Sequence, residues 1–271
     1  MPFSAGHFEM KSKHTKIWQS GRIAYYSIES DQAYWDDIWA TQISKEYYTN
    51  YEQGKLDEYS PSFEKYLKKS DMIIEAGCGT ARFVVALQAR GFRHVTGIDW
   101  GEPTIAKVRT LFPELPIKVG DVTHIDVEDG YYDAYISLGV VEHRKEGPEP
   151  FLMEAFRVTN PGGYALISVP YVNQLRLLKA KLGVYKSKKL KDLSFYQYAF
   201  QKAEFQQLLE GVGFRVLEVK GISGWFGIRE EIPLLASFLD NIPGGYRVQG
   251  FLRRLKLLDH LGHMALYVCT K

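Results

Sequence analysis

Cysteine is scarce in this chain of 271 residues, which has two, Cys78 and Cys269, too few for a disulfide framework. That scarcity is typical of a protein from a reducing compartment. No stretch approaches the roughly 20 apolar residues that a membrane-spanning helix requires, and residues 1–20 lack the apolar core of a signal peptide. We therefore expect a soluble, cytoplasmic protein without stable membrane insertion.

An excess of charge of either sign is also missing. The formal net charge is +2, which argues against a dedicated nucleic-acid binder. With 45% hydrophobic and 24% charged residues, the composition is that of an ordinary globular protein that can bury a sizeable core. The sequence shows neither internal repeats nor low-complexity tracts.

From Ser70 onward the chain alternates short apolar runs with longer helical patterns. This order is typical of a parallel sheet with crossover helices. We expect strands at 72–76, 94–98, 117–119, 132–138, 164–169, 214–219 and 264–269, and helices at 80–90, 103–111, 150–158 and 202–210. The prediction is an α/β fold with a doubly wound, Rossmann-like sheet of seven mostly parallel strands, formed by residues 70–271.

Three segments fall outside this alternation. Residues 1–69 are rich in aromatic side chains, and we expect them to form a helical N-terminal cap at the sheet edge. Insertions at 170–200 and 221–262 are too long for structureless loops in a compact domain. Each insertion is therefore expected to fold or to act as a lid.

A glycine turn between the first strand and the first helix of the sheet is the most informative motif. Gly77 and Gly79 let the backbone approach a ligand closely. Asp99 ends the next strand 20 positions beyond Gly79 (99 − 79 = 20), where doubly wound folds place a carboxylate for ribose hydroxyls. A dinucleotide site requires a small residue where this chain has Arg82, and Glu75 would repel a pyrophosphate. A ligand that carries an ammonium and a sulfonium suits Glu75 better.

Together these motifs resemble those of the class I S-adenosylmethionine-dependent methyltransferases, over roughly residues 70–220 and 264–269. Segments 75–81, 95–99, 120–122 and 132–138 look like the family's first four motifs, and 160–163 matches the turn before its fifth strand. The resemblance implies an antiparallel last strand and S-adenosylmethionine as the cofactor.

The resemblance also implies roles for single residues. Asp99 would bind the ribose, Trp100 would lie against the adenine, and Asp121 would accept a hydrogen bond from the adenine amino group. The implied cofactor site comprises Glu75, Gly77, Cys78, Gly79, Asp99, Trp100, Asp121, Val122 and Leu138.

His143, just beyond the expected strand at 132–138, is the candidate catalytic base. Ligands in this fold lie outside the carboxyl ends of the strands, and an imidazole with a pKa of about 6.5 suits proton transfer near neutrality. The alternative is that His143 only caps the following loop. Glu142 either orients the imidazole or faces solvent. Gly139 stands where metal-dependent members of the family carry an acidic residue, so no metal is expected.

The acceptor is inferred from the insertions. Basic side chains between residues 170 and 200 alternate with aromatic ones, which fits either the binding of an anionic small molecule or a solvated helical face. These basic residues are Arg176, Lys179, Lys181, Lys186, Lys188, Lys189 and Lys191. Trp225 and Phe226 either add a second wall to the site or pack against the added helices.

We expect methyl transfer to a small-molecule acceptor, with O-methylation of a sugar, glycan precursor or natural-product-like substrate as the leading hypothesis. No nucleic acid is expected as a partner, and the sequence does not indicate an oligomeric state. Three alternatives stay open: an N-methyltransferase, a nicotinamide-dependent oxidoreductase, and a catalytically silent methyltransferase-like partner protein.

Overall fold

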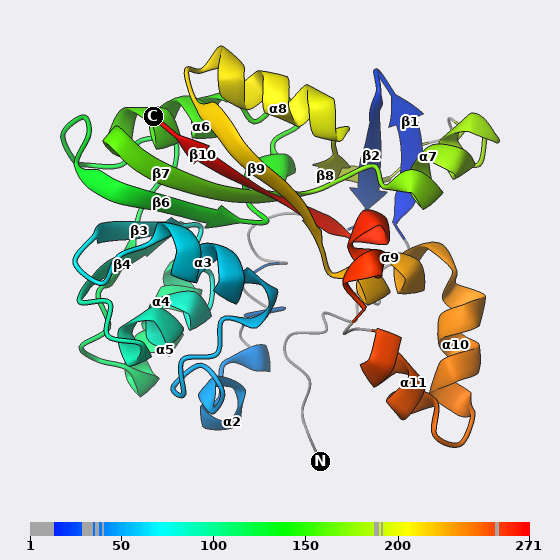
Figure 1. Ribbon diagram of the computed structural model, residues 1–271, viewed down its shortest axis with the longest axis horizontal. Coiled ribbons are helices and arrows are strands. Elements are labelled where there is room, and N and C mark those ends of the chain that lie inside the picture. Colours follow the sequence, from blue (N-terminus) through cyan, green and yellow to red (C-terminus); the bar gives the residue numbers. More distant parts are fainter. Residues whose placement is uncertain are drawn as a thin grey trace.

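The computed structural model describes residues 14–28, 35, 38–39, 41–186, 190, 192–252 and 255–271. Its centre is a seven-stranded sheet with the order β5-β4-β3-β6-β7-β10-β9 (Figure 1). The strands, in that order, are Ile117–Val119, His94–Asp99, Met72–Ala76, Tyr132–Leu138, Thr159–Pro170, Met264–Thr270 and Arg215–Ile222.

The first five strands of that order pair in parallel, whereas β10 is antiparallel to both β7 and β9. A parallel pair needs a crossover connection, and helices provide it here. The predicted Rossmann-like sheet, mostly parallel and with an antiparallel last strand, is confirmed.

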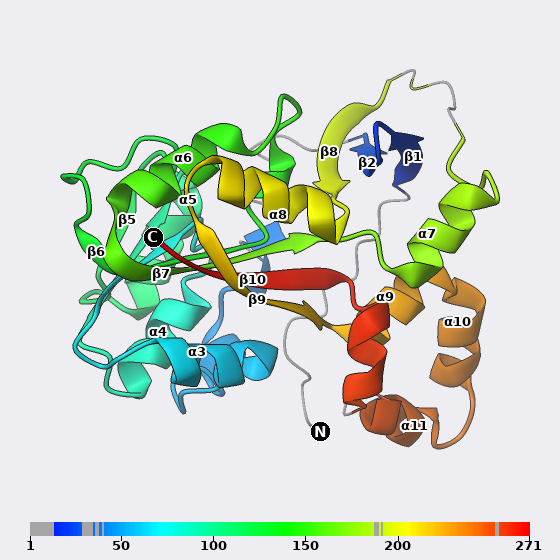
Figure 2. The same ribbon diagram turned by 45° about the horizontal axis from the view of Figure 1, so that its top comes forward.

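Helices cover both faces of the sheet. The helices α3 (Ser60–Tyr66), α4 (Arg82–Ala89) and α5 (Glu102–Leu111) lie on one face, and α6 (Glu149–Val158) and α8 (Lys202–Gly211) lie on the other (Figures 1 and 2).

The strand β3 shows how the sequence produces this layering. Ile73 and Ile74 are both 0% exposed, and each belongs to a different core cluster. Successive side chains of a strand point to opposite faces, so a strand that is covered on both sides reads as a continuous apolar run. The run at 72–76 therefore marks a central strand between two helical layers.

The N-terminal segment differs from its prediction. Instead of helices throughout residues 1–69, β1 (Thr15–Gln19) and β2 (Arg22–Ser27) form an antiparallel hairpin, and β8 (Ser194–Ala199) pairs with β2. The turn residues Ser20 and Gly21 have φ values of 48° and 83°, and two positive φ values at a two-residue turn match the twist of a hairpin. The expectation of a purely helical cap was therefore wrong for 15–27.

Helices follow the hairpin within the same N-terminal segment. They are α2 (Lys45–Tyr48), the 3-10 turn η1 (Asp57–Tyr59) and α3. Tyr48 on α2 donates a hydrogen bond from its hydroxyl to the carbonyl of Thr80 at 2.6 Å. This bond ties α2 to the glycine turn after β3. Residues 1–13, 29–34, 36–37 and 40 lie outside the described residues.

Both insertions contain regular structure. The first forms α7 (Gln174–Lys181) and β8. The second forms α9 (Gly224–Glu231), α10 (Pro233–Asn241), α11 (Gly245–Leu252) and the 3-10 turn η3 (Lys256–Leu261). These elements lie at the end of the central sheet where β10 begins (Figures 1 and 2). There α7 lies beside β1 and β2, and α10 and α11 lie on the side of α9 away from that hairpin.

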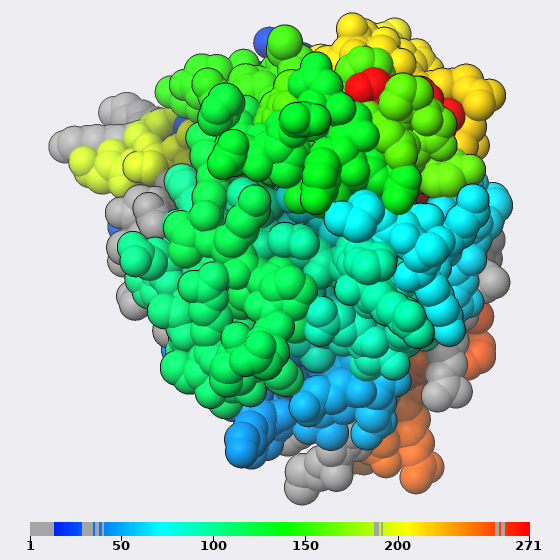
Figure 3. All heavy atoms as spheres, turned by 90° about the vertical axis from the view of Figure 1, so that its left-hand side faces the viewer, coloured from blue at the N-terminus to red at the C-terminus, as the bar shows by residue number. Residues whose placement is uncertain are grey.

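The central domain and the inserted helices α10 and α11 can be told apart on the surface of the molecule (Figure 3). Seen from the left-hand side of Figure 1, the cyan and green residues of the central domain form one continuous surface, and the orange helices project beyond its lower edge (Figure 3). Among the described helices, none has the length and the apolar character needed to cross a bilayer.

Candidate functional site

A cavity of about 1330 Å³ lies where the carboxyl ends of β3, β4 and β6 meet the inserted segments. Ligands of open α/β sheets bind at these strand ends. Every residue predicted for the cofactor or for catalysis lines this one cavity: Glu75, Gly77, Cys78, Gly79, Asp99, Trp100, Asp121, Val122, Leu138 and His143.

The glycine turn between β3 and α4 forms the floor of the cavity. Gly77 has a φ of 77°, and a Cβ at this position would lie 2.4 Å from Cγ2 of Val140. No side chain fits there, because that separation is far below a van der Waals contact and the backbone conformation favours glycine. Cys78 is 6% exposed, and its Sγ would lie 2.9 Å from a Cβ built on Gly97. The Cys78 side chain therefore packs against β4.

Asp99 is held in place at the end of β4. Its Oδ2 accepts a hydrogen bond from the backbone N–H of Gly79 at 2.8 Å, and its Oδ1 accepts one from Gly101 at 3.0 Å. An ionised carboxylate can accept about four hydrogen bonds, and Asp99 is also part of the cavity lining. Trp100, the next residue, is 58% exposed and lies beside it in the cavity wall.

Glu75 is a buried carboxyl group, 3% exposed, that also lines the cavity. Burial raises the pKa of Glu75 to about 8, against the opposing effect of the nearby Arg82 guanidinium. Within the described part of the chain, its Oε2 has no hydrogen-bond partner. Buried polar atoms are normally satisfied, so a cationic donor from a ligand fits this position.

The third and fourth motifs complete the wall next to Trp100. The exposed Asp121 accepts hydrogen bonds at its Oδ1 from the backbone N–H and the hydroxyl of Thr123, both at 2.7 Å. Val122 and Leu138 are half-buried and line the same cavity. This wall thus combines the carboxylate of Asp121 with the apolar side chains of Val122 and Leu138.

His143 lies in the 3-10 turn η2 (Val141–His143) after β6. Its Nδ1 is 2.8 Å from the backbone oxygen of Tyr196 on β8. A carbonyl oxygen can only accept, so Nδ1 carries the proton and Nε2 keeps its lone pair. Burial lowers the pKa of His143 to about 4, so the imidazole is neutral at physiological pH. The pKa of about 6.5 expected from the sequence was therefore wrong, and His143 is a weaker base than that expectation implied. The ring packs edge-on against Trp35 and Tyr196, with centroid distances of 5.0 and 5.1 Å.

Glu142 does not face solvent, which had been one of the two expectations for it. It is 1% exposed, burial raises its pKa to about 8, and its Oε1 lies 3.9 Å from Nε2 of His143. That distance is too long for a hydrogen bond. The carbonyl of Tyr196 orients the imidazole instead, a contact that spans 53 positions of the sequence.

Two of the described basic residues in the first insertion are held in ion pairs, and Lys186 is exposed. Arg176 is 0% exposed and pairs with Glu230 and with Glu231 on α9, and Lys179 bonds Glu231 at 2.8 Å. Lys181 is exposed. Three of the basic residues fall outside the described ranges, namely Lys188, Lys189 and Lys191. Arg176 and Lys179 are thus structural ions rather than anion ligands.

Aromatic residues from distant segments form the rest of the cavity. Trp35 and Tyr196 stack with a centroid distance of 5.7 Å. Trp225 and Phe226 of α9 line the cavity, as one of the two expectations for them had it, and Trp225 also belongs to a core cluster, as the other had it. His263, the residue just before β10, lines the cavity as well and had not been singled out. The aromatic content of the N-terminal segment and of the insertions was the signal for the aromatic part of this wall.

Part of the chain is similar in sequence to known methyltransferases. The family profile described as "Methyltransferase domain" matches residues 74–167. A protein of Mycolicibacterium smegmatis, named as an S-adenosylmethionine-dependent methyltransferase, is 30% identical over 158 residues, which cover 58% of this chain and 57% of that protein. The malonyl-[acyl-carrier protein] O-methyltransferase of Serratia marcescens is 31% identical over 108 residues, 40% of this chain and 42% of that enzyme. The chain spans about half the length of these curated relatives.

A solved structure resembles most of the chain. One chain of the complex between the Haloferax volcanii Trm112 methyltransferase activator and a methyltransferase aligns with a TM-score of 0.60 and 16% identity. The alignment covers 89% of this chain and 97% of that chain. At this identity the likeness shows the fold alone.

Proposed function

Because the chain belongs to the class I S-adenosylmethionine-dependent methyltransferases, we propose that it methylates a hydroxyl oxygen of a small, neutral, aromatic acceptor. The observation that carries this proposal is His143, whose Nδ1 is bound to the carbonyl of Tyr196 and whose Nε2 is left as a base in the cavity. Because members of this family use S-adenosylmethionine, the alternative of a nicotinamide-dependent oxidoreductase is no longer considered.

The residues around the glycine turn fit the cofactor. The unpartnered Oε2 of Glu75 suits the ammonium of the methionine moiety. The fixed carboxylate of Asp99 suits the two ribose hydroxyls. Gly77 allows close approach of the backbone. When bound, S-adenosylmethionine supplies a methyl carbon on a sulfonium, which is open to in-line displacement.

We assign the remaining cofactor contacts by position in the cavity. The exposed indole of Trp100 would lie against the adenine, and Asp121 would accept a hydrogen bond from the adenine amino group, with Val122 beside it. Leu138, at the end of β6, would pack next to the methionine moiety. Gly79 and Cys78 contribute through their backbone, since the Cys78 side chain packs into the core.

A hydroxyl is a poor nucleophile until it loses its proton, and an amine does not need the same help. His143 is neutral and offers Nε2 as the proton acceptor. The bond from Nδ1 to Tyr196 holds the ring, so the base is oriented before the acceptor arrives. The names of relatives do not choose between the two atoms, since the Serratia marcescens protein is named as an O-methyltransferase and a Drosophila melanogaster protein as a lysine and N-terminal methyltransferase homolog. The position and tautomer of His143 favour oxygen over nitrogen as the methylated atom.

The character of the walls favours a flat and uncharged acceptor. Trp35, Tyr196 and Phe226 offer aromatic faces and edges. Arg176 and Lys179, two of the seven basic residues considered for an anionic acceptor, are bound to glutamates of α9. An aromatic natural-product-like alcohol fits this cavity better than a phosphorylated sugar.

Matched acceptors test the proposal. The protein is incubated with S-adenosylmethionine and with 1-naphthol, 1-naphthylamine or a panel of further phenol and aniline pairs, and products are identified by mass spectrometry. We expect methyl ethers from the phenols, lost in His143→Ala while S-adenosylhomocysteine still binds. Methylation of the amines alone, or bound cofactor with no methylated product from any pair, would contradict the proposal and favour the N-methyltransferase or the silent partner.

A further inference from the structure

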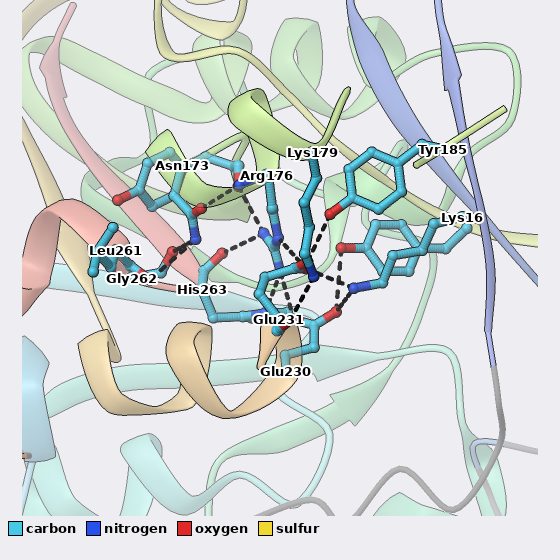
Figure 4. A network of polar contacts seen from close by, with 12 residues as sticks. Lys16, Asn173, Arg176, Lys179, Tyr185, Glu230, Glu231, Leu261, Gly262 and His263 are labelled. Carbon is cyan, nitrogen blue, oxygen red and sulfur yellow. Dashed lines mark hydrogen bonds and ion pairs between the residues drawn. The ribbon is translucent and has the colours of Figure 1, made fainter. Parts of the chain in front are cut away.

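Charged side chains from four segments meet around Arg176, next to His263 of the cavity wall (Figure 4). We call them the Arg176 network: Lys16, Arg176, Lys179, Tyr185, Glu230, Glu231 and His263. They come from β1, from α7 and the turn after it, from α9, and from the residue just before β10. The network therefore joins the N-terminal hairpin, both insertions and the last strand of the sheet.

Arg176 is the centre of this network. Its side chain is 0% exposed, and its Nε donates to Oε1 of Glu231 at 3.1 Å while its Nη2 pairs with Glu230. Its Nη1 donates to the carbonyl of Tyr171 at 2.6 Å. Lys16 adds a second cation, 2.6 Å from Oε1 of Glu230. Two cations thus hold the Glu230 carboxylate ionised.

His263 is the member of the network that lines the cavity. Its Nδ1 lies 2.5 Å from Oε2 of Glu230, and its ring packs edge-on against Phe226 with a centroid distance of 4.8 Å. Its backbone is fixed as well, because its N–H donates to the carbonyl of Ser223 at 3.3 Å and its carbonyl accepts from Tyr171 at 3.2 Å. Its side chain is 12% exposed.

The charges around His263 decide its tautomer. Arg176 and Lys16 keep the pKa of Glu230 well below its usual range although burial acts the other way, so Glu230 is a carboxylate. Nδ1 of His263 also lies 2.8 Å from Nη2 of Arg176, which itself donates to Glu230. Because an unprotonated Nδ1 would turn its lone pair toward the carboxylate oxygen at 2.5 Å, Nδ1 carries the proton and donates a hydrogen bond to Glu230. Burial lowers the pKa of His263, against the opposing effect of Glu230. A neutral imidazole that donates from Nδ1 presents Nε2 as a hydrogen-bond acceptor.

We propose that His263, backed by Glu230, forms a second polar subsite that accepts a hydrogen bond from a hydroxyl or N–H group of the acceptor other than the methylated one. The inference rests on the proposed function and deepens it. It predicts that preferred acceptors carry two donor groups, one for His143 and one for His263. The aromatic faces of the wall discriminate little between such molecules, whereas a buried hydrogen-bond acceptor that is left unpaired does.

Histidine NMR tests this subsite on the wild-type protein loaded with S-adenosylhomocysteine. Long-range ¹H–¹⁵N spectra report the tautomer of each imidazole, and 1,3-dihydroxynaphthalene and 1-naphthol serve as the two-donor and one-donor probes. We expect the Nδ1–H tautomer at His263 and a shift of its Nε2 signal with the two-donor probe only. The exposed His260 is the internal control and should not respond.

Binding constants supply the second measurement. The two-donor probe should bind about 10-fold more tightly than the one-donor probe, the range expected when a buried hydrogen bond is made or missed. His263→Gln, which keeps an acceptor oxygen, should retain part of that preference, and His263→Ala should abolish it. S-adenosylhomocysteine binding reports whether each variant is folded.

The outcomes separate this inference from the one it rests on. If His143 responds to the probes and His263 does not, or if the preference survives in His263→Ala, the subsite is refuted and the proposed function stands. If neither histidine responds and no methylated product forms, the proposed function fails together with the subsite.

Discussion

Binding of the cofactor should release a proton from Glu75. Burial raises the pKa of this carboxyl to about 8, so at pH 7 about 0.9 of a proton is bound in the free protein. The ammonium of the methionine moiety, placed against the unpartnered Oε2, favours the charged carboxylate and lowers that pKa. Up to about 0.9 proton therefore leaves when S-adenosylhomocysteine binds at pH 7.

Calorimetry in two buffers measures this release. The observed binding enthalpy at pH 7 changes with the ionisation enthalpy of the buffer, and comparing phosphate with Tris gives the number of protons released. In Glu75→Gln the release should vanish, and affinity should fall about 10- to 150-fold, which corresponds to a lost charge-assisted hydrogen bond of about 1.5 to 3 kcal/mol.

Glu142→Gln is the matched control, because Glu142 is a second buried carboxyl group of the same cavity with a pKa raised to about 8. Its variant should keep the proton release of the wild type. A release that persists in Glu75→Gln, or a wild type that binds without releasing protons, would refute the assignment of Glu75 to the ammonium.

Three further predictions concern the base and the Arg176 network. His143→Ala should slow turnover by about 10² to 10⁴ with unchanged S-adenosylhomocysteine affinity, whereas Tyr196→Phe, which keeps the backbone carbonyl, should leave turnover near the wild type. Arg176→Met leaves Glu230 without its main counter-charge and should lower the free energy of unfolding by about 3 to 5 kcal/mol in urea titrations. The exposed Arg247→Met should change it by less than about 0.5 kcal/mol. Because burial lowers the pKa of His143 to about 4, its contribution to stability is intact above its unfolded pKa of about 6.5 and is lost as pH falls toward 4. The free energy of unfolding of the wild type should therefore fall between pH 7 and pH 4.5 by about 2.5 kcal/mol more than that of His143→Gln. An equal fall in the two proteins would contradict the neutral imidazole.

The central sheet could be predicted because its signals are local. The buried run at 72–76, the glycine turn and Asp99 at the end of the next strand each follow from short stretches of sequence. Their geometric consequence also follows, since parallel strands place their carboxyl ends at one edge and so gather distant motifs around one cavity.

The rest depended on contacts that no short stretch shows. Arg176 read as part of a basic surface because its partner Glu230 lies 54 positions away on another insertion. His143 is oriented by a backbone carbonyl from β8. Every residue has such a carbonyl, so the residue types in the sequence do not indicate which one binds His143. The aromatic N-terminal segment suggested helices, but Ser20 and Gly21 adopt a hairpin turn that pairs β2 with β8.

The most direct test of the account is isothermal titration of the protein with S-adenosylhomocysteine, with NAD and NADP as controls. We predict micromolar binding of S-adenosylhomocysteine alone. Asp99→Ala should weaken it by about 1.5 to 3 kcal/mol, and Gly77→Val should abolish it, because its Cβ would overlap the space of Val140 beside the cavity floor. Binding of a dinucleotide instead, or S-adenosylhomocysteine affinity that is unchanged in Asp99→Ala and Gly77→Val, would contradict the cofactor site described above.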